Sequence, residues 1–581
     1  MKKTLQNISA KLFLSCAMLI GPNLGAAHSD LQDTIAETGL SGSFLASRVA
    51  IGDNDDGVAL KFLKRAIALD PENVEISRDL FISLVANGQI DEAAAIVKEV
   101  EAIALKNNLA SIVKAVQAIR ERSWNNADEN LGVIEGSDLD KLLREISISW
   151  STFGAGKADD ALDRLEKIEG PDWAKVIRDY HAGLMAAIVG GRDEYSIDKF
   201  QSVIDNRGVV SVLTETYLRS IESIVRIKSK SEDKQAAKDS LKYGLSIAPS
   251  HPPFQNLSAQ LDAGEAIAPL IKSPQEGVSE LFYNVATALQ RDGGSRISKS
   301  YLQLADYLHP GSDSIKIAVA ELFLQEGNYE LSNQYYDSIG EQSPFKRIAL
   351  LEHATNLSRL EKTEEAIEEM RQLIADEPDD LAGYMTLGGL FSREKRYSEA
   401  AEVYEKAIGF VGTPERQHWN LFFRRGIAYE RIKEWSKAEP SFTKSLELSP
   451  NQAEVLNYLG YSWIDQGINL EKGLELIRKA VELRPRSGFI VDSLGWAYYR
   501  IGEFDEAVIE LERAVALMPQ DPTINDHLGD AYWRVGRKLE ATFQWKIALA
   551  AKDPEHDDPA SVELKLKEGL GPVETTAQNS E

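Results

Sequence analysis

The chain has 581 residues, a formal net charge of −26, and 43% hydrophobic and 27% charged residues. So acidic a chain repels phosphate backbones and anionic membranes, which excludes nucleic acid as an expected partner. Its apolar runs stay short of the roughly 18 residues needed to span a bilayer, and its length exceeds what one core supports unless the chain is repetitive.

The first 27 residues have the order of an export signal. Lysines near the start are followed by an apolar run over 12–20 and by small residues up to Ala27. Positive charge, apolar run and small-residue cleavage site are the three parts of a secretory signal peptide. We therefore expect a signal peptide over 1–27, a mature protein beginning at His28, and a periplasmic location.

Cys16, the only cysteine, lies inside that apolar run. One alternative is lipid attachment at Cys16, which would make the protein an outer-membrane lipoprotein and is the one route to membrane association. Because the apolar run continues past it to Ile20, cleavage after Ala27 is favoured. The mature chain would then contain no cysteine, and so neither a disulfide nor a thiol nucleophile, which suits an oxidising compartment.

Small residues recur along the chain with a period of 34 residues. A small side chain at this period is typical of stacked helical pairs, since it lets two helix axes approach to about 8–10 Å. The period is interrupted after the fourth position and then resumes, with small insertions in its last part. The positions are Ala59, Ala93, Ala127, Ala161, Ser298, Ser332, Ala366, Ala400, Ala438, Gly473, Ala507 and Ala541.

The rest of the repeat follows the pattern of the tetratricopeptide repeat (TPR). In the unit that ends at Pro519, Gly495 and Ala507 form the expected contact between two helices, and the proline ends the second helix. A neighbouring unit has one extra residue, which we place in the turn around Gly467–Leu470. The residues that carry the pattern are Leu494, Gly495, Tyr498, Ala507, Leu511, Ala514 and Pro519.

These repeats predict an all-α fold, a TPR solenoid in which about fourteen antiparallel helix pairs form a right-handed superhelix. We expect six pairs in 28–249 and eight in 277–552. The proline-rich segment 250–276 is either a joint between two blocks or a degenerate repeat in one continuous superhelix. In 553–581 we expect a short capping helix over Val562–Leu570 and a disordered tail.

Catalytic motifs are lacking. None of the eight histidines is followed by glutamate, so the H-E-x-x-H zinc-protease pattern cannot occur, and the histidines have no metal-ligand spacing. The Gly154–Lys157 stretch is similar to a phosphate loop, but its spacing differs and no strand precedes it, so we expect a turn between helices. We predict that the chain is not an enzyme and has no cofactor, metal or catalytic residue.

Function should therefore lie on the concave surface, which the first helix of each pair lines. In the last three units these positions are aromatic and charged, and aromatic side chains anchor interfaces. We expect Tyr498, Trp463 and Tyr532 to be core residues, and Trp496 and Trp533 to reach the groove. The predicted partner-binding groove consists of Asn457, Tyr461, Asp492, Trp496, Tyr499, Arg500, Asp526, His527, Asp530, Trp533 and Arg534.

The charges of this groove restrict its ligand. A TPR groove that captures a carboxylate terminus needs cations and amides, whereas only Asn457 fits and Asp492 and Asp526 would repel a carboxylate. A partner with a basic or amide-rich, partly apolar surface fits better.

The stretch Leu456–Leu549, with "DSLGWAYYRIGEFDEA" and "INDHLGDAYWRVGRKLEATFQWKIAL", resembles the C-terminal half of a proteobacterial family of exported TPR proteins. One known member is an outer-membrane lipoprotein that presents cell-wall hydrolases to a periplasmic carboxyl-terminal processing protease. The resemblance implies a protein-protein interaction scaffold and adaptor, with the protease and peptidoglycan hydrolases as partners. Two alternatives stay open: a scaffold subunit of an envelope assembly or polysaccharide-export complex, and a hydrolase or transferase with unrecognised residues.

Overall fold

A computed structural model describes residues 35, 38–53, 55–101, 108–232, 234–265, 267–291, 295–551 and 559–571. The signal peptide over 1–27, Cys16 and the tail beyond residue 571 lie outside these residues. No helix in the described ranges is both long enough and apolar enough to cross a membrane.

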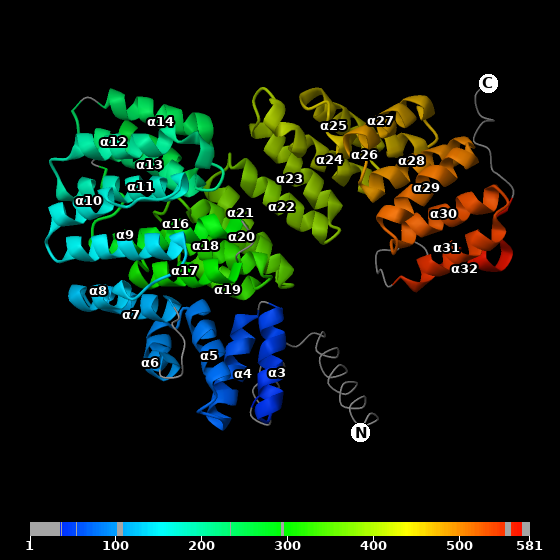
Figure 1. The fold of residues 1–581 in the computed structure, drawn as a ribbon. Helices are drawn as coiled ribbons and strands as arrows, with labels where there is room; N and C mark the ends of the chain where they lie inside the picture. The colour runs from blue at the N-terminus through cyan, green and yellow to red at the C-terminus, as the bar shows by residue number, and fades with distance from the viewer. Residues whose placement is uncertain are drawn as a thin grey trace. The chain divides into compact units, whose positions relative to one another are not determined.

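The described chain is all-helical and divides into two compact units, 1–361 and 362–581 (Figure 1). Helices of the first unit are α3 Leu40–Gly52, α4 Asp56–Leu69, α5 Val74–Ala86, α6 Ile90–Glu101, α7 Asn108–Arg120, α8 Trp124–Gly132, α9 Asp138–Gly154, α10 Ala158–Glu166, α11 Asp172–Val189, α12 Asp193–Asp205, η1 Arg207–Val209, α13 Thr214–Lys228, α14 Gln235–Ile247, α15 Pro252–Asp262, α16 Pro274–Arg291, α17 Ser295–Leu308, α18 Asp313–Gln325, α19 Tyr329–Asp337 and α20 Lys346–Arg359. Those of the second are α21 Thr363–Asp376, α22 Leu381–Arg393, α23 Tyr397–Phe410, η2 Arg416–His418, α24 Trp419–Arg431, α25 Trp435–Leu448, α26 Ala453–Asp465, α27 Leu470–Leu483, α28 Gly488–Ile501, α29 Phe504–Leu517, α30 Pro522–Arg534, α31 Lys538–Ala550 and α32 Pro559–Glu568.

The predicted repeat of helix pairs is confirmed. Six pairs, α3/α4 to α13/α14, precede residue 250, two more lie in the first unit after 274, and five lie in the second unit. Helices α20 and α21 follow the same sequence spacing and bring the number of pairs to fourteen. The division between the units falls between these two helices in the sequence. The eleven alanines and serines of the predicted period are all 0% exposed. The period therefore marks the contact between the two helices of a pair.

Where the small residue is serine, its hydroxyl also bonds to the first helix. The hydroxyls of Ser298 and Ser332 donate to the carbonyl oxygens of Ala286 (2.8 Å) and Ala320 (2.9 Å). Each bond satisfies a buried polar group at a place where helix backbones come close. Serine thus fills the alanine position without leaving an unpaired hydroxyl.

The Gly460 unit brings two helix backbones closer than a side chain allows. A Cβ added to Gly460 would lie 2.7 Å from the carbonyl oxygen of Gly473. A Cβ added to Gly473 would lie 2.9 Å from the carbonyl oxygen of Gly460. The turn of this unit holds the extra residue, as predicted: four residues, ending at Asn469 with φ of +47°, join α26 to α27. Three residues join α24 to α25, whose units have the ordinary length.

The Gly154–Lys157 stretch, which is similar to a phosphate loop, is part of a turn. Gly154 ends α9, and α10 begins at Ala158. Gly156 has a φ of +83°, which glycine adopts without strain, and this places it in the tight connection of a helix pair.

The predicted joint at 250–276 does not coincide with the division between the compact units, which falls after Glu361. Helix α15 begins within the joint and packs on α13 and α14. Beyond it, α16 contacts α9, α11 and α13, and α17 contacts α5 and α7 (Figure 1). All five are first helices of earlier pairs, so the α16/α17 pair occupies the surface that those helices would otherwise offer a ligand.

A buried polar network holds α16 against α11 and α13. The Arg219 guanidinium donates two hydrogen bonds to Glu280, at 2.6 and 2.8 Å, and the Tyr180 hydroxyl donates a third at 2.7 Å. Burial alone would raise the pKa of Glu280, but Arg219 and Tyr180 hold it below its ordinary value. The bidentate geometry specifies how α16 sits among helices that lie far away in sequence.

A second buried ion pair holds α17. The Lys299 ammonium, with a side chain 3% exposed, lies 2.9 Å from Asp56 of α4 and 2.7 Å from Glu326, which follows the last residue of α18. Both carboxylates are themselves buried, so the one cation compensates two charges that would otherwise be costly. The first unit is thus held together by contacts between its two ends as well as between neighbouring repeats.

Candidate functional site

The candidate site is the surface that the last three first helices form in the second unit. Helix α26 contacts α28, and α28 contacts α30, so successive first helices lie side by side. Glycines at the centre of these helices make room for the second helices: a Cβ on Gly495 would lie 2.5 Å from Leu511, and one on Gly529 2.4 Å from Trp545. Close packing behind leaves the opposite face of α26, α28 and α30 to carry the predicted groove residues.

The structure divides the eleven predicted residues by their burial. Asp492, His527 and Asp530 are 7, 9 and 5% exposed, so these three hold helices together and do not face a groove. This corrects their predicted placement, because each has a charged partner on an adjacent helix. The other eight are half-buried and stay predicted contact residues: Asn457, Tyr461, Trp496, Tyr499, Arg500, Asp526, Trp533 and Arg534. Of the three residues predicted to be core, Tyr532 is 6% exposed, whereas Trp463 and Tyr498 are half-buried.

An aromatic stack crosses from α28 to α30. The Trp496 ring lies parallel to Tyr499, with centroids 4.7 Å apart, and to His527, with centroids 4.0 Å apart. The Nδ1 atom of His527 in turn lies 2.9 Å from the Asp492 carboxylate. The aspartate therefore fixes the imidazole, and the imidazole supports the tryptophan that is predicted to meet a partner.

The C-terminal helix α32 covers the end of this surface. Val562 is 1% exposed in the core that α32 shares with α31. The Lys565 ammonium reaches α30, where it bonds to Asp526 (2.8 Å) and Asp530 (2.9 Å). The chain thus binds one of its own lysines with two acids of the predicted groove.

Four contacts across this surface share one spacing of 35 residues. They join Asp465 to Arg500 (2.9 Å), Asp492 to His527, Tyr499 to Arg534 (3.1 Å) and Asp530 to Lys565. In a 34-residue repeat, a spacing of 35 joins a residue to the position one later in the next repeat, whereas in the Gly460 unit, which has one extra residue, it joins equivalent positions. Asp465 and Lys565 are absent from the predicted set, and this complementary spacing is the signal that identifies them.

These pairs change the electrostatic argument for the partner. Asp492 faces His527, and Asp526 and Asp530 share Lys565, so each of the three aspartates already has a basic partner within the chain. The preference for a basic partner therefore does not rest on these aspartates. What the surface offers is half-buried aromatic rings, with Arg500 and Arg534 held in place by their own partners.

His527 predicts a pH-dependent stability of the second unit. Burial lowers the pKa of His527, but the Asp492 carboxylate, with Asp526 and Asp530 on its own helix, outweighs burial and raises it, although Lys565 lies beside those two acids. A raised pKa stabilises the fold fully below the unfolded value of about 6.5, and this stabilisation is lost as pH rises through the folded pKa.

We expect the free energy of unfolding of the second unit to fall between pH 6 and 8 in the wild type and to fall less in His527→Gln. Hydrogen exchange of peptides from α28 and α30 measures it. His418→Gln, at a second histidine of this unit, is the control and should retain the wild-type slope. Equal slopes in all three proteins would contradict the prediction.

Among the described residues, no group of three or more histidines, cysteines, aspartates or glutamates is placed to hold a metal ion. The surface on α26, α28 and α30 is built from rings, amides and paired charges. Aromatic side chains of this kind provide contact area in protein-protein interfaces.

The fold and this surface define the chain as a TPR solenoid. Three family models match it: one described as tetratricopeptide repeat over 51–116, a second so described over 351–414, and one described as TPR repeat over 495–536. The matches fall in both units, and the last covers most of α28 to α30.

Curated relatives share part of the chain. The TPR repeat-containing protein PA4667 of Pseudomonas aeruginosa is 27% identical over 160 residues, which are 27% of this chain and 26% of that protein. The protein O-mannosyl-transferase TMTC1 of Homo sapiens is 24% identical over 178 residues, 30% of this chain and 20% of that protein. The chain thus matches about a quarter or less of the length of these relatives.

Solved structures of TPR proteins are similar at low identity. The APC/C hetero-tetramer Cut9-Hcn1 covers 93% of this chain and 98% of its own, with 12% identity and a TM-score of 0.39. YrrB, whose structure is described as a TPR protein with an unusual peptide-binding site, covers 30% of this chain and 89% of its own, with 20% identity and a TM-score of 0.26.

Proposed function

We propose that the chain is a non-catalytic scaffold that acts outside the cytoplasm and binds other proteins through the face of α26, α28 and α30. TPR proteins bind proteins or peptides and are generally non-catalytic. The observation that carries the proposal is the aromatic stack of Trp496 on Tyr499 and His527, half-buried on that face. A rigid, partly exposed tryptophan is the side chain that most often dominates an interface.

The finer proposal is a periplasmic adaptor that presents cell-wall hydrolases to a carboxyl-terminal processing protease. It is supported by the signal-peptide pattern before His28 and by the resemblance of Leu456–Leu549 to exported TPR proteins. The first helices α26, α28 and α30 of this stretch lie side by side, and this supports the proposal because an adaptor needs a continuous face for its partner.

Trp496→Ala is expected to reduce partner retention about tenfold, because an interface tryptophan typically contributes one to several kcal/mol to binding. Tagged mature protein is incubated with periplasmic extract, crosslinked and recovered, and the bound proteins are quantified by mass spectrometry. Trp173→Ala, which removes a half-buried tryptophan from the first unit, is the matched control.

The adaptor proposal requires that the processing protease and its hydrolase substrates are recovered together. If neither the protease nor the hydrolases are recovered, the adaptor proposal is wrong. Equal recovery by wild type and Trp496→Ala would remove the α26–α30 face as the binding surface.

A further inference from the structure

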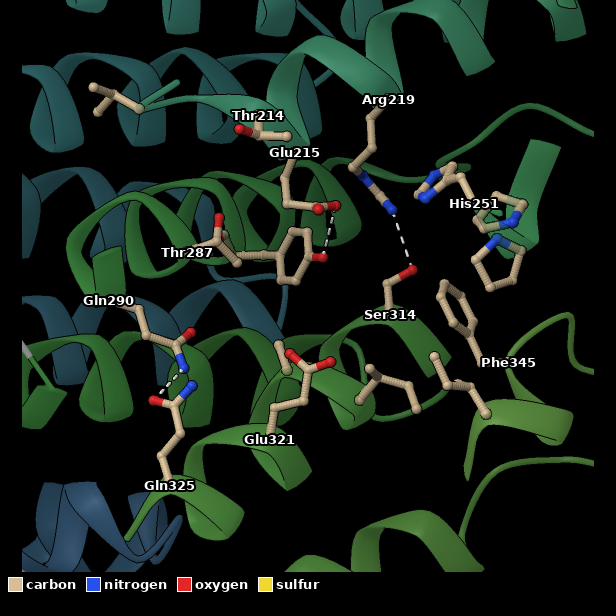
Figure 2. A pocket seen from close by; sticks show the side chains of 17 residues that line it. Thr214, Glu215, Arg219, His251, Thr287, Gln290, Ser314, Glu321, Gln325 and Phe345 are labelled. Atoms are coloured by element: carbon tan, nitrogen blue, oxygen red, sulfur yellow. Dashed lines mark hydrogen bonds between the residues drawn. The ribbon is translucent and has the colours of Figure 1, made fainter. Parts of the chain in front are cut away.

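The first unit contains a cavity of about 450 Å³ between its last helices. Side chains from α13, α16 and α18 line it, with His251 before α15 and Phe345 before α20 closing one side (Figure 2). The α16/α17 pair packs on first helices of earlier repeats, and the cavity lies between α16 and its neighbours α13 and α18. Its residues lie far from the candidate site in sequence, and the inference goes beyond the proposed function.

Two carboxylates from opposite walls point into this space. Glu215 reaches in from α13 and accepts a hydrogen bond from the Tyr283 hydroxyl at 3.2 Å, and Glu321 reaches in from α18 (Figure 2). Among the described residues neither carboxylate lies within ion-pair distance of a cation. Glu215 is half-buried and Glu321 is exposed, so both carboxylates are open to a ligand that enters the cavity.

Neither basic residue that lines the cavity supplies a free positive charge to the two carboxylates. Arg219 lines it, but its guanidinium is bound to Glu280 through two hydrogen bonds. Burial lowers the pKa of His251, which leaves its imidazole neutral at neutral pH. The cavity therefore has a net negative charge in a partly enclosed space, where an added cation is attracted more strongly than at an open surface.

The walls around the acids suit an apolar stem. Tyr283, Ile317 and Phe345 face the cavity together with Ile348, and the amides of Gln290 and Gln325 bond to each other at its far end, 3.2 Å apart. A ligand that fits must present a positive charge to the carboxylates and a flexible hydrocarbon chain to the walls. Lysine side chains bury their stems in this manner.

We propose that this cavity binds a primary ammonium on a flexible alkyl chain, the side chain of a lysine in an extended segment of a partner protein. An ammonium fits better than a guanidinium because Glu215 and Glu321 approach from opposite helices, and a compact ammonium can donate in several directions. A guanidinium prefers both oxygens in one plane, as in the bidentate pair of Arg219 and Glu280.

Binding should release a proton. Burial, with the carboxylates of Glu215 and Glu352, raises the pKa of Glu321 to about 7, so this acid is partly protonated at neutral pH. A bound ammonium stabilises the charged carboxylate and lowers its pKa. The titratable or charged groups that face Glu321 from the surrounding elements are Glu215 and Arg219 of α13, His251, Tyr283 of α16, Tyr336 of α19 and Glu352 of α20.

The test is calorimetric titration of the full mature chain at low salt with three probes. These are a blocked five-residue peptide with one central lysine between alanines, the same peptide with norleucine in place of lysine, and spermidine. We expect saturable binding of the lysine peptide, none of the norleucine peptide, and at least tenfold weaker binding in Glu321→Gln and in Glu215→Gln. Glu330→Gln on α19, an exposed glutamate outside the cavity, makes the same charge change and should bind as the wild type does.

Proton release on binding distinguishes a direct contact between the ammonium and Glu321 from a purely structural role of Glu321. Titration at pH 7 in two buffers of different ionisation enthalpy should show release of a fraction of a proton in the wild type and in Glu330→Gln, and a smaller one in Glu321→Gln. Spermidine that binds more tightly than the lysine peptide assigns the ammonium to a free polyamine instead of a protein. The absence of saturable binding of either cation, or wild-type affinity in both cavity variants, would overturn the proposal.

Discussion

Glu280→Ala is expected to lower the free energy of unfolding of the first unit by about 3–5 kcal/mol, the range for breaking a buried ion pair from one side. The Arg219 and Glu280 side chains are 8 and 5% exposed, and the pair is held by two hydrogen bonds. Without the carboxylate, the buried guanidinium loses its hydrogen-bonded counter-charge and the Tyr180 hydroxyl loses its acceptor. Hydrogen exchange of peptides from α11, α13 and α16 measures the loss.

The matched control removes both charges. Arg219→Met combined with Glu280→Leu replaces the ion pair by apolar side chains of similar size, which is often neutral or stabilising. We expect this double variant to recover most of the lost stability. A loss below about 1 kcal/mol in Glu280→Ala would show that water compensates Arg219 and that the network does not hold α16 in place.

Gly460→Val is expected to lower the free energy of unfolding of the second unit by about 2–3 kcal/mol, the upper part of the range for overpacking a core. The added Cβ would lie 2.7 Å from the carbonyl oxygen of Gly473, and a backbone atom cannot move aside as a flexible side chain can. Helices α26 and α27 must therefore separate, which loosens the core cluster around Ile464 and Ile477. Exchange of α26 and α27 peptides reports the change.

Gly389→Val on α22 introduces the same side chain in the same unit. A Cβ at Gly389 meets no atom within 4 Å, so we expect no loss of stability and a small gain from removing a helical glycine. If both variants are equally stable, the close approach at Gly460 does not limit the packing of these helices.

The helix pairs were predictable because the information for them is local. Small residues such as Ala507, a glycine twelve residues before and a proline twelve residues after act within one repeat and its neighbour. The turn at Asn469 was predictable for the same reason, since one inserted residue has to enter the connection of a pair whose helices have fixed length. A period in the sequence is enough to place such elements.

The candidate site was predictable only in part. Position within the repeat put Trp496, Tyr499 and Arg534 on the face of the first helices, and the structure leaves them half-buried there. Position within the repeat could not show that Asp492 is paired with His527, because that pair depends on how far the two side chains reach between successive first helices. Lys565 was not predicted for a similar reason. It lies on the capping helix α32, outside the repeats, and its partners Asp526 and Asp530 lie on α30.

By itself the sequence determined the all-helical repeat, the number of pairs and the face on which its aromatic residues lie, because each depends on interactions within about 34 residues. Only the tertiary structure decided what fills that face. Lys299 meets Asp56 across 243 residues and Arg219 meets Glu280 across 61, contacts that bring α16 and α17 onto earlier helices. Such contacts depend on the superhelical path of many stacked pairs, in which small rotations per repeat accumulate, and no local period encodes where that path returns.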